Sequence, residues 1–305
     1  MPDFPSPQPA DLSALRIGIL GLDTSHAEAF TRLLNRAGEP GHVPGGRVVS
    51  AWAGGSPDIA LSRERVSGYT ATLRGDFGVK ILDSPEAVAA SVDAILLAAL
   101  DAREHPALLA RVLPFAKPVF VDKPLSLTEG EGKAMFGAAA ECGVPLFSSS
   151  ALRFAPAWTE ALAALPAPDL LGADVHGAMS MEPSQPGYSW YGIHGIEMLF
   201  RAMGSGFESV AVHRTADHDL LVGKWADGRI GTVRGNRTGN HNFGGLLHTA
   251  KETRFVAVDS HPRPFYACLV EAIIGFFRTG IAPVSPDETM EILRFIDQAN
   301  AQRCP

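Results

Sequence analysis

Short apolar runs alternate with segments of helical periodicity between about residues 15 and 150. The runs at 15–21 and 118–122 have the length and composition of buried parallel strands. The segments at 27–36 and 128–142 place their apolar residues at helical spacing. This alternation predicts a doubly wound parallel sheet, in which ligands bind beyond the carboxyl ends of the strands.

The second half of the chain has a different pattern. β-rich runs at 220–225 and 229–234 flank Ala226-Asp227-Gly228, and an Asp-Gly turn between such runs indicates a β-hairpin. Further strands are expected at 209–213 and 254–258, and helices at 192–203, 264–278 and 287–301. The sequence therefore predicts an α/β protein of two domains. Residues 1–150 form a Rossmann-type dinucleotide-binding domain, and residues 151–305 form an α+β substrate and oligomerisation domain with an open, mainly antiparallel sheet.

The overall charge favours small-molecule chemistry by exclusion. The 305 residues carry a formal net charge of −7 at pH 7, so no global field attracts nucleic acid or an anionic membrane. No apolar window has the length needed to span a bilayer, and the Pro-rich start at 1–10 lacks the features of a secretory signal. We therefore expect a cytoplasmic protein that acts on a small-molecule substrate.

A metal site is not expected. Cys142, Cys268 and Cys304 are scattered and lack CxxC spacing, which disfavours both a disulfide framework and a zinc site. His213 and His218 lie beside acidic residues, but their spacing matches no metal signature and is more typical of solvated loops.

Five short motifs occur in a fixed order along the chain. They are Arg16-Ile-Gly-Ile-Leu-Gly21, Asp93-Ala-Ile-Leu-Leu-Ala-Ala-Leu100 followed by His105, Lys117-Pro-Val-Phe-Val-Asp-Lys-Pro-Leu125, Arg153-Phe-Ala-Pro156 and Gly192-Ile-His-Gly-Ile-Glu197. In this order and with these gaps, they resemble the Gfo/Idh/MocA family of oxidoreductases. The third motif is similar to the family's Glu-Lys-Pro, with an aspartate in place of the glutamate.

The resemblance implies a Rossmann domain followed by a C-terminal α/β domain whose open sheet joins subunits, so a homo-oligomer, dimer or tetramer, is expected. It also implies NAD or NADP as cofactor, and sugars, polyols or related hydroxyl compounds as substrates. Three of the motif residues are assigned to the cofactor site in this way, namely Leu100, His105 and Asp122.

Lys123 and His194 are the predicted catalytic pair. Lys123 ends a predicted strand, and Pro124 biases it toward an extended conformation that can project into the crevice. By resemblance, Lys123 hydrogen-bonds the reacting hydroxyl, His194 is the second proton-transfer group, and Glu197 orients the imidazole or serves the site itself. The alternatives are a solvated lysine paired with Asp122 and a capping or core histidine.

Three further side chains are candidates for substrate contacts. Arg153 and Tyr191 are each as easily interpreted as a surface ion pair and a packed aromatic ring. Trp190 stands where the family places an acid four residues before its histidine. Its presence departs from the standard set used for alcohol oxidation.

The glycine-rich turn departs from the Gly-x-Gly-x-x-Gly pattern of dinucleotide sites. The window reads Gly21-Leu-Asp23-Thr24-Ser25-His26, so only the first glycine is kept. A carboxylate 4 Å from a phosphate charge is repelled by about 4 kcal/mol at an effective dielectric near 20, unless it turns away. The next three residues offer compensating donors at a helix N-terminus, and Asp23 could alternatively be the N-cap of that helix.

The predicted second strand lacks the acid that binds the adenosine ribose in NAD enzymes. Its end reads Ala51-Trp-Ala-Gly-Gly-Ser56. A loop without an acid tolerates a 2′-phosphate, with Ser56, Arg63 or Arg65 as partners, and this favours NADP slightly. The other interpretation is that no nucleotide binds.

Two functions are compatible with these residues. The first is an NAD(P)-dependent oxidoreductase acting on a hydroxyl or carbonyl of a sugar-like or polyol substrate. The second is a redox-silent relative, such as a sugar lyase, a hydrolase or a ligand-binding protein, that has lost dinucleotide binding.

Overall fold

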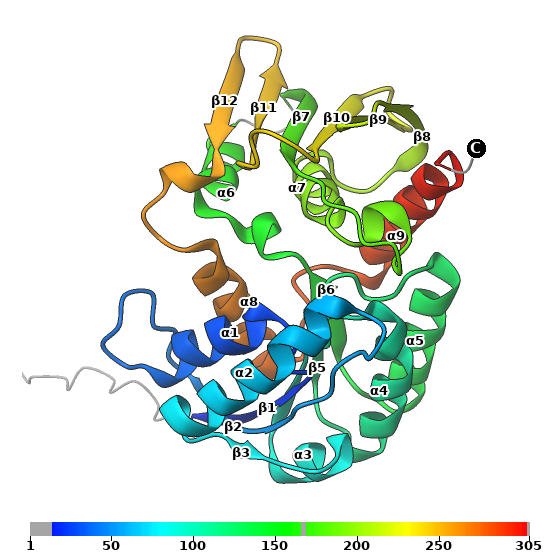
Figure 1. The fold of residues 1–305 in the computed structure, drawn as a ribbon. Coiled ribbons are helices and arrows are strands. Elements are labelled where there is room, and N and C mark those ends of the chain that lie inside the picture. Colours follow the sequence, from blue (N-terminus) through cyan, green and yellow to red (C-terminus); the bar gives the residue numbers. More distant parts are fainter. Residues whose placement is uncertain (1–13, 166–168, 304–305) are drawn as a thin grey trace, which may run out of the picture.

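The computed structural model describes residues 14–165 and 169–303. In Figure 1 a parallel sheet with its helices fills the lower half of the view, and a second sheet lies above it.

The first sheet has the strand order expected of a dinucleotide-binding domain. Its strands are β1 (Leu15–Leu20), β2 (Gly46–Trp52), β3 (Lys80–Ile81), β4 (Ala94–Leu97), β5 (Val119–Asp122) and β6 (Leu146–Ser149). They are all parallel and lie in the order β3-β2-β1-β4-β5-β6. This confirms the predicted Rossmann-type sheet, and it places the switch point for ligand binding between β1 and β4.

Five helices connect these strands. They are α1 (Ser25–Asn35), α2 (Ala60–Phe77), α3 (Pro85–Ser91), α4 (His105–Val112) and α5 (Glu129–Glu141). Thr24, Ser84 and Thr128 are the N-caps of α1, α3 and α5, and each side chain accepts a backbone N–H of the first turn. Short 3-10 turns follow two strands, with η1 (Ala102–Glu104) after β4 and η3 (Ala151–Phe154) after β6.

The second sheet is mixed and mostly antiparallel. Its strands are β7 (Leu170–Ala178), β8 (Phe207–Arg214), β9 (His218–Trp225), β10 (Ile230–Asn236), β11 (Gly244–Thr249) and β12 (Thr253–Ala257), in the order β12-β11-β7-β10-β9-β8. Only β7 and β10 run parallel to each other. The predicted hairpin turn joins β9 to β10, where Gly228 takes a φ of +88° that favours glycine. Strands β7 and β11 were not expected from the sequence.

Helices cover one face of the second sheet. They are α6 (Pro156–Ala163), α7 (Ile193–Met203) and α9 (Pro286–Ala301). The inward residues of the strands, such as Val175 and Val233, pack with Ile196 and Leu199 of α7 in one core. Residues that alternate with them stay accessible, and Ile230 and Phe255 are 57% and 62% exposed.

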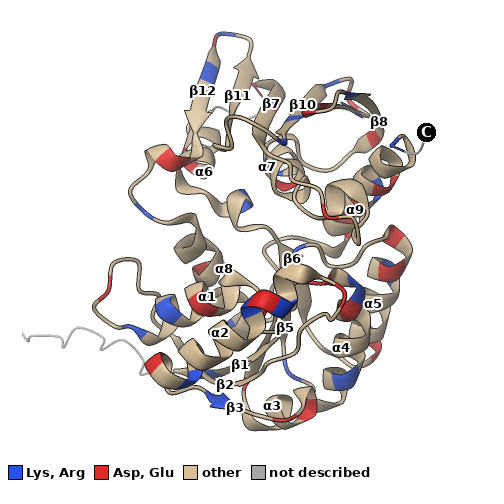
Figure 2. Ribbon diagram, in the orientation of Figure 1, with Lys and Arg blue, Asp and Glu red and all other residues tan. Residues whose placement is uncertain are grey.

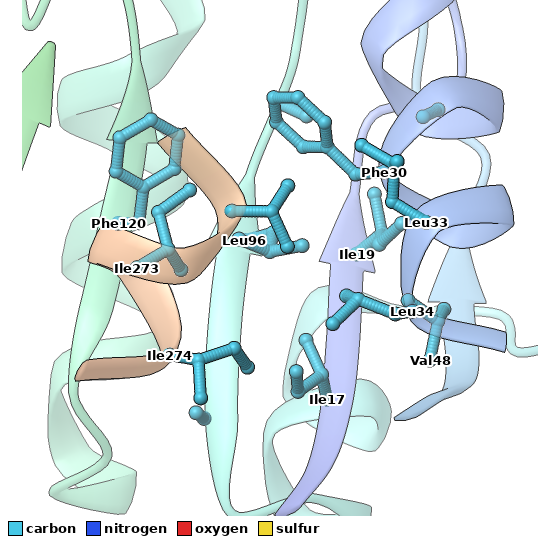
Figure 3. Packing of buried hydrophobic residues seen from close by; sticks show 14 of the residues in the cluster. Ile17, Ile19, Phe30, Leu33, Leu34, Val48, Leu96, Phe120, Ile273 and Ile274 are labelled. Carbon is cyan, nitrogen blue, oxygen red and sulfur yellow. The ribbon is translucent and has the colours of Figure 1, made fainter. Parts of the chain in front are cut away.

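Helix α8 (Phe265–Thr279) returns to the first half of the chain. Its residues Ile273 and Ile274 share one buried cluster with Ile17 of β1, Leu96 of β4 and Phe120 of β5 (Figure 3). The division expected at residue 150 therefore describes the two sheets, whereas α8 crosses it. The reason is that α8 covers apolar strand residues of the parallel sheet that would otherwise face water.

Charged residues of both signs are interspersed over the two halves (Figure 2). Within the described ranges, no helix combines the length and the apolar character that crossing a membrane requires.

Candidate active site

A cavity of about 370 Å³ lies beyond the carboxyl ends of the parallel strands, lined by side chains from both halves of the chain. The turn after β1 contributes Thr24, Ser25 and His26, and the residue that follows β5 is Lys123. From the second half, His194 on α7 lines the same space. Two larger hollows, of about 630 and 580 Å³, hold neither predicted catalytic side chain.

Lys123 directly follows β5 and lines the cavity. Its backbone N–H donates to Oδ1 of Asp122 at 2.9 Å, and the peptide bond to Pro124 is cis. Burial lowers the pKa of the Lys123 ammonium, and the charge of Asp122 only partly opposes this shift. Lys123 is therefore better able to give up a proton near neutral pH than a lysine in water.

His194 faces Lys123 across the same cavity. Its Nδ1 lies 2.7 Å from Oγ of Ser150, which also accepts the backbone N–H of Leu152. The Ser150 hydroxyl is thus free to donate its own hydrogen to Nδ1, which leaves the hydrogen of a neutral imidazole on Nε2. Burial first, and then the charges of Lys123 and His26, hold the pKa of His194 well below its ordinary value.

His26 occupies the third glycine position of the dinucleotide pattern and forms a buried pair. Its Nδ1 lies 2.6 Å from Oδ2 of Asp122, and its Nε2 lies 3.1 Å from the hydroxyl of Tyr266 on α8. Burial opposes ionisation of Asp122, but His26 and Lys123 hold its pKa at about 2. His26 therefore lines the cavity, whereas Asp122 is enclosed behind it. Tyr266 was not singled out from the sequence.

Glu197 and Arg153 are buried beside each other, away from the cavity lining. Arg153 Nη1 lies 3.3 Å from Oε2 of Glu197, and its other guanidinium nitrogen contacts Glu288. Glu197 Oε1 also accepts the backbone N–H of Ser150 at 3.2 Å. Burial raises the pKa of Glu197 although Arg153 lowers it. The structure thus places Glu197 behind His194, where it can position Ser150, rather than in contact with a ligand.

Trp190 and Tyr191 both line the cavity, as expected of substrate contacts. The Tyr191 ring meets the His194 ring edge-on, with centroids 5.0 Å apart. Ser180 and Arg65 also line the cavity; Ser180 was not singled out from the sequence, and Arg65 only as a phosphate partner.

The turn after β1 depends on Gly21. Its φ is +95°, and a Cβ there would lie 2.5 Å from Cα of Ala99 at the end of β4. Only glycine lets these two strand ends approach so closely. The first glycine of the dinucleotide pattern therefore keeps its structural role.

Asp23, at the second glycine position, turns away from the cavity. It is fully buried, accepts the Ser62 hydroxyl at 2.7 Å and accepts the backbone N–H of Leu100 at 3.0 Å. The N-cap of α1 is Thr24, whose Oγ1 accepts the His26 N–H, so the interpretation of Asp23 as the cap is wrong. The physical reason is that the Asp23 carboxylate already accepts two hydrogen bonds, one from α2 and one from the loop after β4.

His105 joins two loops beneath the site. Its Nε2 lies 2.8 Å from the carbonyl oxygen of Ala99 and its Nδ1 lies 3.0 Å from that of Pro124. It is fully buried and lines neither side of the ligand groove. Leu100, by contrast, lines the cavity.

A second, much smaller space lies at the end of β2. Ser56 lines it together with Asp23, Trp52 and Asp101, and it holds only about 10 Å³, roughly one water molecule. The Ser56 hydroxyl donates to Oδ2 of Asp101 at 2.6 Å. In a doubly wound sheet the adenosine half of a dinucleotide binds at this end of the groove.

The larger cavity and the small space at the end of β2 differ in how well they fit a dinucleotide. On the cavity side lie Thr24 and Ser25 at the N-terminus of α1, and the N-terminus of a helix suits a pyrophosphate. On the adenosine side, the donors and acceptors are of the right kind, but polar side chains fill the space between them. Among the residues that the structure describes, no three His, Cys, Asp or Glu side chains form a metal-binding group.

Comparison with known proteins agrees with this architecture. Residues 15–150 match the model of the GFO_IDH_MocA family, described as an oxidoreductase family with an NAD-binding Rossmann fold. This match covers the N-terminal domain, which is somewhat less than half of the chain. No curated protein sequence matches the chain.

Several solved structures share the whole fold. GenD2 from gentamicin A biosynthesis, in complex with NAD, is 15% identical with a TM-score of 0.74, and the match covers 98% of this chain and 97% of that one. A putative myo-inositol dehydrogenase from Sinorhizobium meliloti 1021 has 15% identity, a TM-score of 0.74 and coverage of 95% and 98%. UDP-N-acetylglucosamine 3-dehydrogenase GnnA from Acidithiobacillus ferrooxidans has 14% identity, a TM-score of 0.74 and coverage of 95% and 97%. At these identities, the likeness concerns the fold.

Proposed function

We propose that this protein is an NAD(P)-dependent oxidoreductase acting on a hydroxyl or carbonyl group of a sugar-like or polyol substrate. The observation that carries the proposal is that Lys123 and His194 line one cavity at the carboxyl ends of the parallel strands. The family match over residues 15–150 and the dehydrogenases among the similar folds support it.

The proposed chemistry places the two side chains around one substrate oxygen. The Lys123 amine, whose pKa is lowered, accepts the proton of this oxygen during oxidation, and the Nε2–H of the neutral His194 imidazole donates a hydrogen bond to the same oxygen. A nicotinamide, when bound, would supply the hydride chemistry at the substrate carbon. In reduction Lys123 returns the proton to the oxygen.

The other residues of the cavity would bind and orient the cofactor and the substrate. Thr24 and Ser25 at the start of α1 would hold the pyrophosphate, with Arg65 as a further cation at the cavity wall. Trp190 and Tyr191 would pack against the substrate and keep water from the reacting carbon. Glu197 and Arg153 keep the Ser150 backbone in place and make no contact with the ligand.

One observation favours the second candidate, a relative that uses the same pair for acid–base chemistry without a dinucleotide. On the side of the groove where the adenosine of a dinucleotide would bind, side chains fill most of the space. The remaining volume of about 10 Å³ is too small for a nucleoside. A lyase or hydrolase would need only the cavity of about 370 Å³, which is within the usual size of a small-ligand pocket.

A thermal-shift titration with NADH and NADPH separates the two candidates. A ligand that binds only the native state stabilises it and so raises the melting temperature. At a ligand concentration one hundred times the Kd, the free energy of unfolding increases by about 2.7 kcal/mol. We expect a shift with a dinucleotide, followed by substrate-dependent change in nicotinamide absorbance across a panel of polyols and sugars. If millimolar NADH and NADPH both leave the melting temperature unchanged, the oxidoreductase proposal fails.

We also propose that subunits pair through the uncovered face of the second sheet. Ile230 on β10 and Phe255 on β12 are more than half exposed there, and α7 packs on the opposite face. Replacing both by lysine should convert a dimer or tetramer to monomers in sedimentation experiments, because burying two ammonium groups in an apolar interface is unfavourable. A wild-type monomer at micromolar concentration contradicts this.

A further inference from the structure

Helix α8 brings a tyrosine into the candidate active site. Tyr266, in the first turn of α8, is half-buried and lines the cavity of about 370 Å³. Its ring packs against Phe30 and Phe265, with centroids 6.0 and 4.8 Å away. Apolar neighbours therefore hold the ring, whereas the hydroxyl contacts His26, a second residue of the cavity lining.

A chain of three contacts joins Tyr266 to the backbone of Lys123. The Lys123 N–H donates to Oδ1 of Asp122 at 2.9 Å, and Oδ2 of Asp122 lies 2.6 Å from Nδ1 of His26. Nε2 of His26 lies 3.1 Å from the Tyr266 hydroxyl. Because Asp122 and His26 are both buried, this chain fixes the Tyr266 hydroxyl relative to the start of the Lys123 side chain.

The ionised Asp122 determines which atom of the chain carries each hydrogen. Burial opposes its ionisation, but His26 and Lys123 hold its pKa at about 2, so its oxygens only accept. Nδ1 of His26 must then carry a hydrogen, and Nε2 of the neutral imidazole accepts the hydrogen of Tyr266. Burial, and then the charge of Asp122, raises the pKa of Tyr266 to about 12, so its hydroxyl stays protonated.

The Tyr266 oxygen is left as an acceptor at the cavity wall. Among the residues that the structure describes, Nε2 of His26 is the only hydrogen-bond partner of this hydroxyl, and their bond uses its hydrogen. The lone pairs of the oxygen remain for a ligand that donates an O–H or N–H. Lys123 and His194 act on one substrate oxygen in the proposed chemistry, so Tyr266 is available to a second polar group of the same molecule.

We propose that Tyr266 is a specificity-determining residue that accepts a hydrogen bond from a second hydroxyl of the substrate, so that the cavity prefers diols to compounds with one hydroxyl. The inference rests on the proposed function and deepens it, because it concerns the substrate of the same cavity. A compound without the second hydroxyl leaves the Tyr266 oxygen without a donor, and a site built for a hydroxyl discriminates against such an analogue.

A purely structural role, in which Tyr266 only holds His26 in place, leads to a different expectation. Removing the hydroxyl would then change stability, or would weaken all ligands of the cavity by the same factor. The deciding measurement is therefore the difference in affinity between ligands that differ by one hydroxyl.

The first experiment measures Kd values of cyclohexanol and of 1,2-, 1,3- and 1,4-cyclohexanediol for the full chain by ligand-observed NMR titration. The proteins are the wild type and Tyr266→Phe, with Tyr69→Phe as a control that removes a phenolic hydroxyl outside the cavity lining. We expect the wild type to bind at least one diol about tenfold more tightly than cyclohexanol. Tyr266→Phe should abolish this preference and leave the Kd of cyclohexanol unchanged, and Tyr69→Phe should match the wild type.

A second experiment needs no ligand. The nitrogen chemical shifts of the His26 ring at pH 8 distinguish a hydrogen on Nδ1 from one on Nε2, and His26→Gln assigns the signals. We expect the hydrogen on Nδ1, and a shift of the Nε2 signal in Tyr266→Phe, where this nitrogen loses its donor.

The inference is overturned if no diol binds more tightly than cyclohexanol, if Tyr266→Phe keeps the wild-type preference, or if His26 carries its hydrogen on Nε2. None of these results affects the binding of NADH or NADPH, whose absence in the thermal-shift titration would instead end the oxidoreductase proposal. Should Tyr266→Phe not fold, the preference of the wild type and the position of the His26 hydrogen still decide the question.

Discussion

The two ends of the ligand groove differ in how their polar groups are used. At the end near α1 and β5, Lys123 and His194 face open space, and burial shifts the pKa values of both. At the end near β2, Ser56, Asp101 and Gln185 hydrogen-bond to one another and leave almost no space. The comparison teaches that the reactive end and the binding end of one groove can change independently of each other, because different side chains form them.

The largest effect is expected from Lys123→Met. It removes the amine that handles the substrate proton, so kcat should fall by about 10²- to 10⁴-fold. The affinity for NADH should change little, because Lys123 lies at the open end. Lys133→Met, at an exposed position of α5, is the control and should leave kcat unchanged. Equal losses of kcat in both variants would mean that the two ends do not differ as described.

Asp122→Asn tests how much the contact between Asp122 and His26 contributes to the free energy of unfolding. It replaces the carboxylate that hydrogen-bonds Nδ1 of His26 by a neutral amide, and loss of a buried hydrogen bond to a charged group typically costs about 1.5–3 kcal/mol. The exposed pair of Asp93 with Arg16 should cost only about 0–1 kcal/mol when broken by Asp93→Asn. Urea unfolding at pH 7 measures both. A smaller loss for Asp122→Asn than for Asp93→Asn would contradict the burial argument.

The pH dependence of the free energy of unfolding should reveal the lowered pKa of His194. Its pKa in the folded protein lies well below 6.5, whereas the unfolded chain takes up a proton near 6.5. The unfolded state therefore binds more protons below that pH, and the free energy of unfolding falls as pH falls, by at most about 1.4 kcal/mol per pH unit. His194→Gln should remove this contribution between pH 6.5 and 5, whereas His213→Gln at an exposed position should not. If the free energy of unfolding depends on pH in the same way in the wild type and in His194→Gln, His194 is not the group responsible.

The smallest effect on stability and rate is expected at the end of the groove near β2, where side chains leave almost no space. Ser56→Ala removes a hydroxyl that donates to Asp58 and Asp101, each of which keeps Arg103 as a partner. We expect a loss of about 1 kcal/mol in unfolding free energy and no change in kcat at saturating cofactor. Chemical denaturation and steady-state rates give the two numbers. A large drop in kcat would show that the closed end takes part in the chemistry.

The parallel sheet could be predicted from the sequence because its strands are buried on both faces and appear as continuous apolar runs. Strands β7 and β11 escaped prediction because each exposes one face and contains glycines, as in Gly244-Gly245. Such runs lack the β-branched and aromatic residues that signal a strand.

That Lys123 and His194 share a site could likewise be expected from the sequence, because both lie in local motifs, and they line one cavity in the structure. The roles of Tyr266 and Gln185 could not, because each depends on a contact with a residue more than 80 positions away. From the sequence, Glu197 was expected either to orient the imidazole or to serve the site itself, and Arg153 was a candidate for a substrate contact or a surface ion pair. Their opposite charges pair in the interior instead, a pairing that spacing along the chain does not reveal.

The return of α8 to the first half means that the chain passes between the two halves at least three times, after β6, before α8 and after it. Three covalent segments restrict the ways in which the two halves can move relative to each other. We therefore expect the proposed dinucleotide to enter by rearrangement of loops at the groove, such as the one that carries Gln185. Entry should accordingly be slow compared with diffusion, and its rate should report on the loop rather than on hinge motion between the two sheets.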